Sequence, residues 1–81
     1  MYQSSRPNKE RKQFYGFMER NKRQGQVGRK KVGYYIQRKG YTSYKIGKGD
    51  NGTFVDVVNK RGTPVAELLV KKKHITWWCV K

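Results

Sequence analysis

Apolar and polar residues alternate along the second half of the chain, from Val32 onward. A period of two is typical of β-strands that bury one face. Glycine-containing turns interrupt the alternation, most clearly in the stretch GKGDNG. The pattern therefore predicts five short strands, over residues 32–37, 41–46, 53–59, 63–70 and 75–80. For residues 63–70 a short helix opened by Thr and Pro remains the alternative.

The first two of these strands are expected to pair through the three-residue loop 38–40, which ends on a glycine. This register collects alternate apolar residues on one face, with Tyr34 and Tyr44 among them. It leaves Tyr35 and Tyr41 on the opposite face, exposed to solvent. Exposed tyrosines on a sheet can stack on unpaired bases.

The next two strands are expected to pair so that Val57 lies opposite Ala66 on one apolar face. The same register puts Asp56 opposite Glu67, and neighbouring lysines would have to neutralise that pair. In the last strand, Trp77-Trp78 must point to opposite faces. One tryptophan is expected in the core, and the other either beneath the N-terminal segment or exposed to a ligand.

The N-terminal part of the chain contains one candidate helix, over residues 9–24. Its apolar side chains recur at helical spacing, although Gly16 weakens the helix and an extended conformation is the alternative. Residues 1–8 are expected to be disordered, and residues 24–31 to be a flexible basic connection. The predicted organisation is thus a basic N-terminal segment, 1–31, followed by a β domain, 32–81. The fold class is mainly β: a small five-stranded antiparallel barrel of the SH3-like or OB-like kind.

The net charge of the chain indicates what kind of partner it binds. Its 81 residues include 20 lysines and arginines and 5 acids, a net charge of +15. Residues 1–31 carry ten basic and two acidic residues, so the excess is shared between both halves. Because such a surface repels itself, a folded chain this basic is expected to have an acidic partner.

Other functional classes find little support in the sequence. Cys79 is the only cysteine and His74 the only histidine, so ligands for a metal site and pairs for catalysis are too few. We expect no enzyme activity, no metal and no cofactor. No long apolar run predicts a membrane helix or a signal peptide, and a cytoplasmic location is expected. The RNA-recognition aromatic signature, the GXXG clamp and zinc-knuckle spacing are absent.

The leading hypothesis is a nucleic-acid-binding protein, for DNA or RNA, whose binding depends little on sequence because lysine and arginine contact phosphates. The exposed tyrosines favour single strands or RNA slightly over duplex DNA. The candidate binding residues are the basic clusters with the tyrosines between them: Arg29, Lys30, Lys31, Tyr35, Arg38, Lys39, Tyr41, Lys45, Lys60, Arg61, Lys71, Lys72 and Lys73. The alternatives are a module that docks on an acidic protein, such as a polymerase or nuclease, and a subunit of a nucleoprotein particle.

Overall fold

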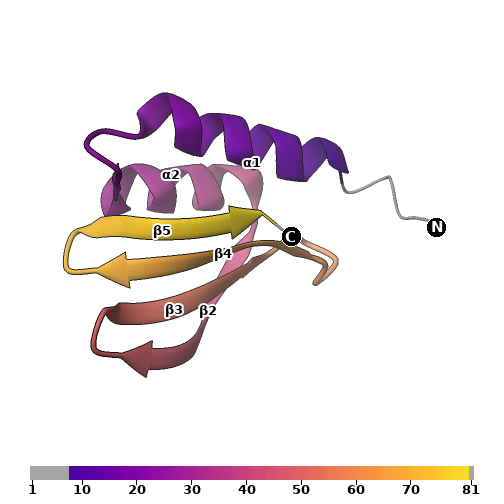
Figure 1. Ribbon diagram of the computed structural model, residues 1–81. Coiled ribbons are helices and arrows are strands. Elements are labelled where there is room, and N and C mark those ends of the chain that lie inside the picture. Colours follow the sequence, from indigo (N-terminus) through magenta and orange to yellow (C-terminus); the bar gives the residue numbers. More distant parts are fainter. Residues whose placement is uncertain (1–7, 81) are drawn as a thin grey trace.

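The computed structural model describes residues 8–80, which form two helices and five strands (Figure 1). The disorder expected for residues 1–8 therefore falls almost wholly outside the described residues. In chain order the elements are α1 (Asn8–Asn21), β1 (Val27–Gly28), α2 (Arg29–Lys39), β2 (Thr42–Gly49), β3 (Gly52–Val58), β4 (Pro64–Lys71) and β5 (His74–Val80).

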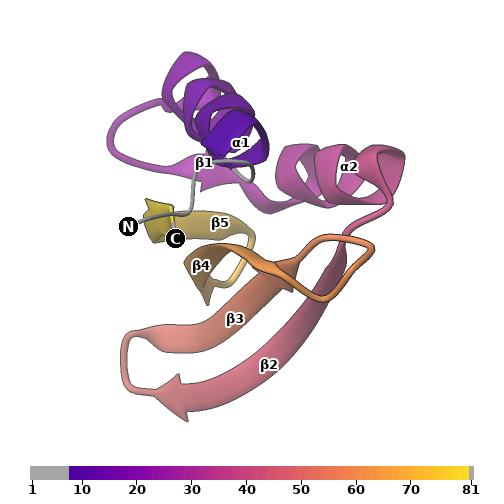
Figure 2. The same cartoon turned by 90° about the vertical axis from the view of Figure 1, so that its right-hand side faces the viewer.

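The strands form one antiparallel sheet in the order β1-β5-β4-β3-β2. Both helices lie on the same side of this sheet, while β2 and β3 curve away from them (Figure 2). A mainly β fold with a five-stranded sheet is confirmed. The sheet is not closed, since β1 and β2 are its two edges, and the barrel expected from the sequence is not confirmed.

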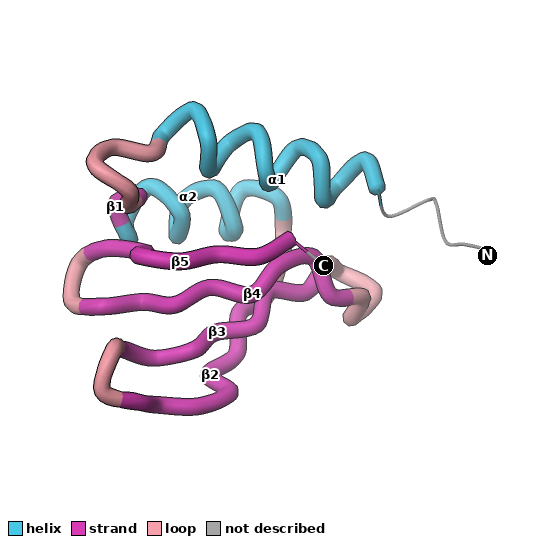
Figure 3. The backbone as a smooth tube through the Cα atoms, in the orientation of Figure 1, coloured by secondary structure: helices cyan, strands magenta, loops and turns pink. Residues whose placement is uncertain are grey.

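The connections gather at two ends of the molecule (Figure 3). The β2–β3 and β4–β5 turns and the start of α2 lie at one end, here called the turn end. The loop 59–63, the end of α2 and the start of α1 lie at the other, here called the loop end. Candidate basic residues that are far apart in the sequence therefore lie together at one end of the molecule or the other.

The prediction of a strand over residues 32–37 is wrong, because these residues belong to helix α2. Val32, Tyr35 and Ile36 have the i, i+3, i+4 spacing of an amphipathic helix, and all three pack on the core. The helix ends at Gly40, whose φ of 78° is the left-handed conformation that glycine adopts at little cost. Gly40, expected to end a hairpin loop, is thus the cap of a helix.

The exposure predicted for three tyrosines is wrong for the same reason. Tyr35 is only 6% exposed, and its ring stacks on Phe17 at 4.3 Å between centroids. Tyr34 and Tyr44, expected in the core, are instead 67% and 54% exposed. The exposed sheet tyrosine at position 35, on which the preference for single strands partly rested, is therefore contradicted.

The later strands follow the sequence closely. The strand predicted over residues 63–70 is present as β4, Pro64–Lys71, and not as a helix, and β5 covers the predicted residues 75–80. The pairs Val57–Ala66 and Asp56–Glu67 are confirmed as cross-strand neighbours. Gly52 opens β3 with a φ of 132°, and a side chain there would collide with the backbone carbonyl of Val70.

The helix predicted over residues 9–24 is present as α1, and it supplies part of the core. Phe14 and Met18 are fully buried, and Phe17 lies beside them against Tyr35. The flexible connection expected over 24–31 is instead β1 followed by the first turn of α2. The backbone N–H of Arg29 donates to the carbonyl of Lys73 at 2.8 Å, which fixes the start of α2 to the β4–β5 turn.

The two tryptophans take opposite faces, as expected. Trp78 lies across from buried Leu68 and packs against the core. Trp77 lies across from Leu69 on the other face, where it is 42% exposed. Described residues of the N-terminal helix therefore leave a large part of this second tryptophan uncovered.

Candidate nucleic-acid interface

Helix α2 has one face in the core and one face in solvent. Its eleven residues include five lysines and arginines and no acid. With Val32 and Tyr35 buried, the helical repeat turns an exposed set outward. We call this set the α2 surface: Lys30, Lys31, Tyr34, Gln37 and Arg38. It extends over about 12 Å of helix axis at the usual rise per residue.

A groove runs between α2 and the curved β2–β3 hairpin, with a volume of about 540 Å³. Its floor is apolar, with Ile36 and Val55 among its residues. Arg29, Lys45 and Lys72 line the same groove from the helix, the hairpin and the β4–β5 turn. Three cations from separate segments thus border one recess, which suits a chain of phosphates along its rim.

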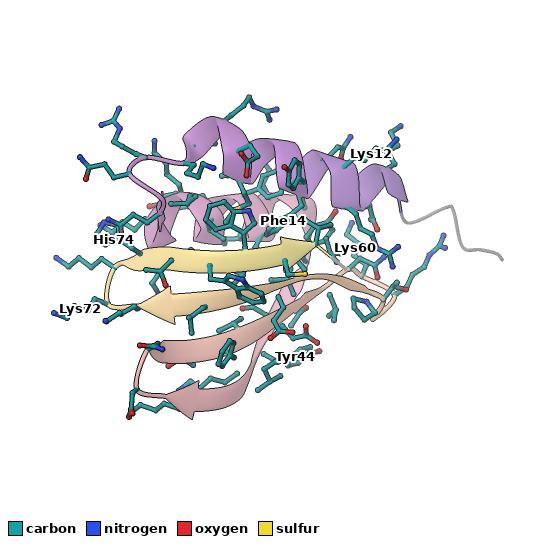
Figure 4. All side chains as sticks on the ribbon, in the orientation of Figure 1. Lys12, Phe14, Tyr44, Lys60, Lys72 and His74 are labelled. Atoms are coloured by element: carbon teal, nitrogen blue, oxygen red, sulfur yellow. The ribbon has the colours of Figure 1, made fainter. Side chains whose placement is uncertain are left out.

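A second basic cluster lies at the loop end. Lys39, Lys60 and Arg61 line one recess together with Tyr41 and Glu10. The Lys60 side chain crosses Gly40, which has no side chain to prevent this approach. Figure 4 shows Lys60 and Lys12 toward this end, with Lys72 and His74 at the opposite, turn end.

Asn59 fixes the loop that carries Lys60 and Arg61. Its side-chain oxygen accepts hydrogen bonds from the backbone N–H groups of Arg61 and Thr63, each at 2.9 Å. Its amide nitrogen donates to Glu10 of α1, also at 2.9 Å. One side chain therefore holds the basic loop and ties it to the first helix.

No protein-family model, curated protein or solved structure matches this chain. Among the described residues, no group of three or more histidines, cysteines and acids is placed to hold a metal ion. Within the same residues, no helix is long and apolar enough to cross a membrane.

The structure divides the candidate binding residues into four groups. The groove brings together Arg29, Lys45 and Lys72, and the loop end brings together Lys39, Tyr41, Lys60 and Arg61. The α2 surface includes Lys30, Lys31 and Arg38, while Lys71 and Lys73 are exposed beside the β4–β5 turn. Tyr35 is withdrawn because its ring lies in the core, and Tyr41, also expected to be exposed, is instead partly buried against the core, just before β2 begins.

Sequence reasoning missed Tyr34 and Gln37, which the structure places on the α2 surface. The signal was present: if Val32, Tyr35 and Ile36 form one helical stripe, residues 34 and 37 must lie on the far side. Lys48, near the end of β2, is a further exposed cation that was not selected.

Tyr41 gives the loop end a pH-dependent contact. Burial, the neighbouring Glu10 carboxylate and Tyr35 together raise the pKa of Tyr41 to about 12, and burial has the largest effect. A tyrosine whose pKa is higher in the folded than in the unfolded state stabilises the fold below the unfolded pKa, and this contribution is lost as pH rises through the folded pKa. We expect Tyr41→Phe to flatten the fall in unfolding free energy between pH 10.0 and about 12.

Urea unfolding of the parent and of Tyr41→Phe across this range measures the effect. Lysine deprotonation affects both proteins alike and cancels in the comparison. Identical pH slopes for the two proteins would show that the environment of Tyr41 does not favour its neutral form.

Proposed function

We propose that this protein binds nucleic acid through the α2 surface and the two basic clusters that flank it, without chemistry on the bound strand. The observation that carries the proposal is α2 itself, a helix with five cations, no acid and a largely exposed outer face. Cations attract phosphates and release their counterions, and this gain dominates affinity that does not depend on sequence.

The distribution of the acids supports the same surface. Glu19 pairs with Lys22 on α1, and Glu10 holds Asn59. Asp56 and Glu67 lie opposite each other on β3 and β4, on the face of the sheet away from the helices. None of the five acids lies on α2 or lines the groove beside it; Asp50 lies in the β2–β3 turn, and Glu10 lines the loop-end recess. Phosphates approaching the α2 surface would thus meet cations with little opposing charge.

The shape of this surface favours a duplex over a single strand. An exposed helix fits the major groove of B-form DNA, which is about 12 Å wide. Gln37 is a side chain that can form hydrogen bonds with base edges, and Tyr34 offers an aromatic ring between it and Lys30. Lys45 and Lys72, across the groove, would then reach the flanking phosphates.

A salt titration tests the proposal. If about five phosphates are contacted, duplex affinity should fall roughly 10²–10³-fold between about 50 and 200 mM salt. Fluorescence anisotropy with labelled duplex DNA, duplex RNA and single strands gives the slopes. Absence of binding to all of them at low salt would contradict the proposal and favour docking on an acidic protein. Tighter binding to single strands would contradict the duplex preference alone.

A further inference from the structure

The face of the sheet opposite the helices has no covering element among the described residues (Figure 1). Val55, Val57 and Leu68 point into the core, so their alternate neighbours on β3 and β4 point away from it. The register extends this set to β2 and β5. We call it the open face: Tyr44, Phe54, Asp56, Glu67, Leu69, Lys71, Trp77 and Cys79.

An apolar row crosses the middle of the open face. Phe54 pairs with Leu69, and Leu69 pairs with Trp77, so three neighbouring strands contribute one large side chain each. The rings of Phe54 and Trp77 meet edge to face at 6.2 Å between centroids. Tryptophan and phenylalanine are enriched at the centres of protein interfaces. A row of this kind on a strongly basic chain is therefore a candidate contact surface.

Charges of opposite sign flank this row. On β4, Glu67 lies two residues before Leu69 and Lys71 two residues after it, so all three share one face. Asp56 lies across from Glu67 and strengthens the negative side, and its Oδ1 atom is buried without a hydrogen-bond partner. The open face is thus acidic on one side of the apolar row and basic on the other.

This order makes the face complementary to itself. A twofold axis along the apolar row would place Leu69 against Leu69 of a second copy. The same rotation exchanges the two sides, so that Lys71 of one copy faces Glu67 and Asp56 of the other. We propose that two copies of this chain pack through their open faces into a symmetric dimer. Such an interface, with one patch used twice, is the commonest kind in soluble oligomers.

The net charge of +15 works against any dimer, but at moderate salt most of the repulsion between the two α2 surfaces is screened. Two sheets pack about 10 Å apart, and both helices lie on the outer side of their own sheet (Figure 2). The α2 surfaces would therefore be separated by two helix layers and two sheets, well beyond the Debye length of about 8 Å at physiological salt. Nucleic acid is the less suitable occupant, since Asp56 and Glu67 would repel its phosphates.

Charge exchange at the flanks tests the dimer. The measurement is sedimentation equilibrium of nuclease-treated protein up to about 100 µM at about 0.15 M salt. Glu67→Lys alone and Lys71→Glu alone each place like charges opposite one another, and each should weaken dimerisation about tenfold or more. The double variant, Glu67→Lys with Lys71→Glu, restores opposite charges and should regain much of the lost affinity.

Two further variants complete the experiment. Trp77→Ala removes a central anchor and should also weaken the dimer about tenfold or more. Lys12→Glu, on the exposed side of α1, changes the net charge as Lys71→Glu does but should leave dimerisation nearly unchanged. Circular dichroism of every variant establishes that the fold is retained.

The possible results separate clearly. A dimer weakened by each single exchange and recovered in the double exchange supports the proposal. A parent protein that stays monomeric over the whole range overturns it, as does a dimer that none of the open-face changes weakens. Because the measurement contains no nucleic acid, its result is independent of whether the proposed binding function is correct.

Discussion

Replacing Lys30, Lys31 and Arg38 with alanine is expected to weaken duplex binding about 10²–10³-fold at about 0.1 M salt. Each lost phosphate contact removes close to one unit from the slope of log affinity against log salt, so the three together should lower that slope by nearly three units. The side chains are exposed, and none belongs to the hydrophobic core. Stability should therefore change little, and anisotropy titrations at several salt concentrations measure the loss.

A matched triple variant separates local contact from the general field of a basic protein. Lys9, Lys12 and Arg20 are exposed on α1, and their replacement by alanine removes the same charge. We expect only a severalfold loss from this control, since screening limits charges that do not touch the strand. Equal losses from the two triples would show that binding is spread over the whole surface and does not centre on α2.

The second large effect concerns stability. Phe14→Ala should lower the free energy of unfolding by about 3–5 kcal/mol, because it leaves a cavity in a fully buried site. The Phe14 ring meets Tyr35 edge to face at 5.5 Å, so the loss would reach α2 as well as α1. In a domain of this size, such a change removes much of the total stability. Urea unfolding followed by circular dichroism measures it.

Tyr15→Ala is the control for this change, since Tyr15 neighbours Phe14 in sequence but is 54% exposed. Its effect should stay within about 1 kcal/mol. If Phe14→Ala unfolds at the same urea concentration as the parent, α1 is not part of the cooperative core. In that case the buried position of its aromatic residues would have to be reconsidered.

The strands β3 and β5 were predictable because each has consecutive β-branched or aromatic residues. For β4 a helix remained an alternative, and the strand was favoured because its register with β3 keeps Val57 and Ala66 on a shared apolar face. The α1 helix was also predictable, from apolar residues at helical spacing. In both cases local pattern and tertiary packing indicate the same structure.

The sequence failed at residues 32–37 because a short segment can satisfy two periods at once. Val32, Tyr34 and Ile36 alternate as in a strand, while Val32, Tyr35 and Ile36 form a helical stripe. Local pattern cannot choose between them, since the choice depends on whether position 34 or position 35 meets the core. Phe14 and Phe17 decide between the two, because Phe14 meets the Tyr35 ring edge to face and Phe17 stacks on it, across about twenty positions of sequence.

In the candidate site, too, one part could be predicted from the sequence and another part depended on the fold. Charge alone was enough to select the lysines and arginines, and most are exposed in the clusters where they were expected. Their grouping into a groove and a loop-end recess depends on the path of the chain, which the wrong first hairpin concealed. Tyr34 and Gln37 were missed for that reason.

The side chains of helix α2 divide, by their angle around the helix axis, into a face that packs on the core and an exposed face that we propose binds nucleic acid. Substitutions at Val32, Tyr35 or Ile36 would alter the core, whereas those at Lys30, Tyr34 or Gln37 would alter only what the helix meets outside. Outward positions can therefore vary during evolution without a matching change elsewhere in the chain. The same property makes the helix a convenient scaffold for directed evolution, in which a library of outer-face residues could acquire new sequence preferences on an unchanged fold.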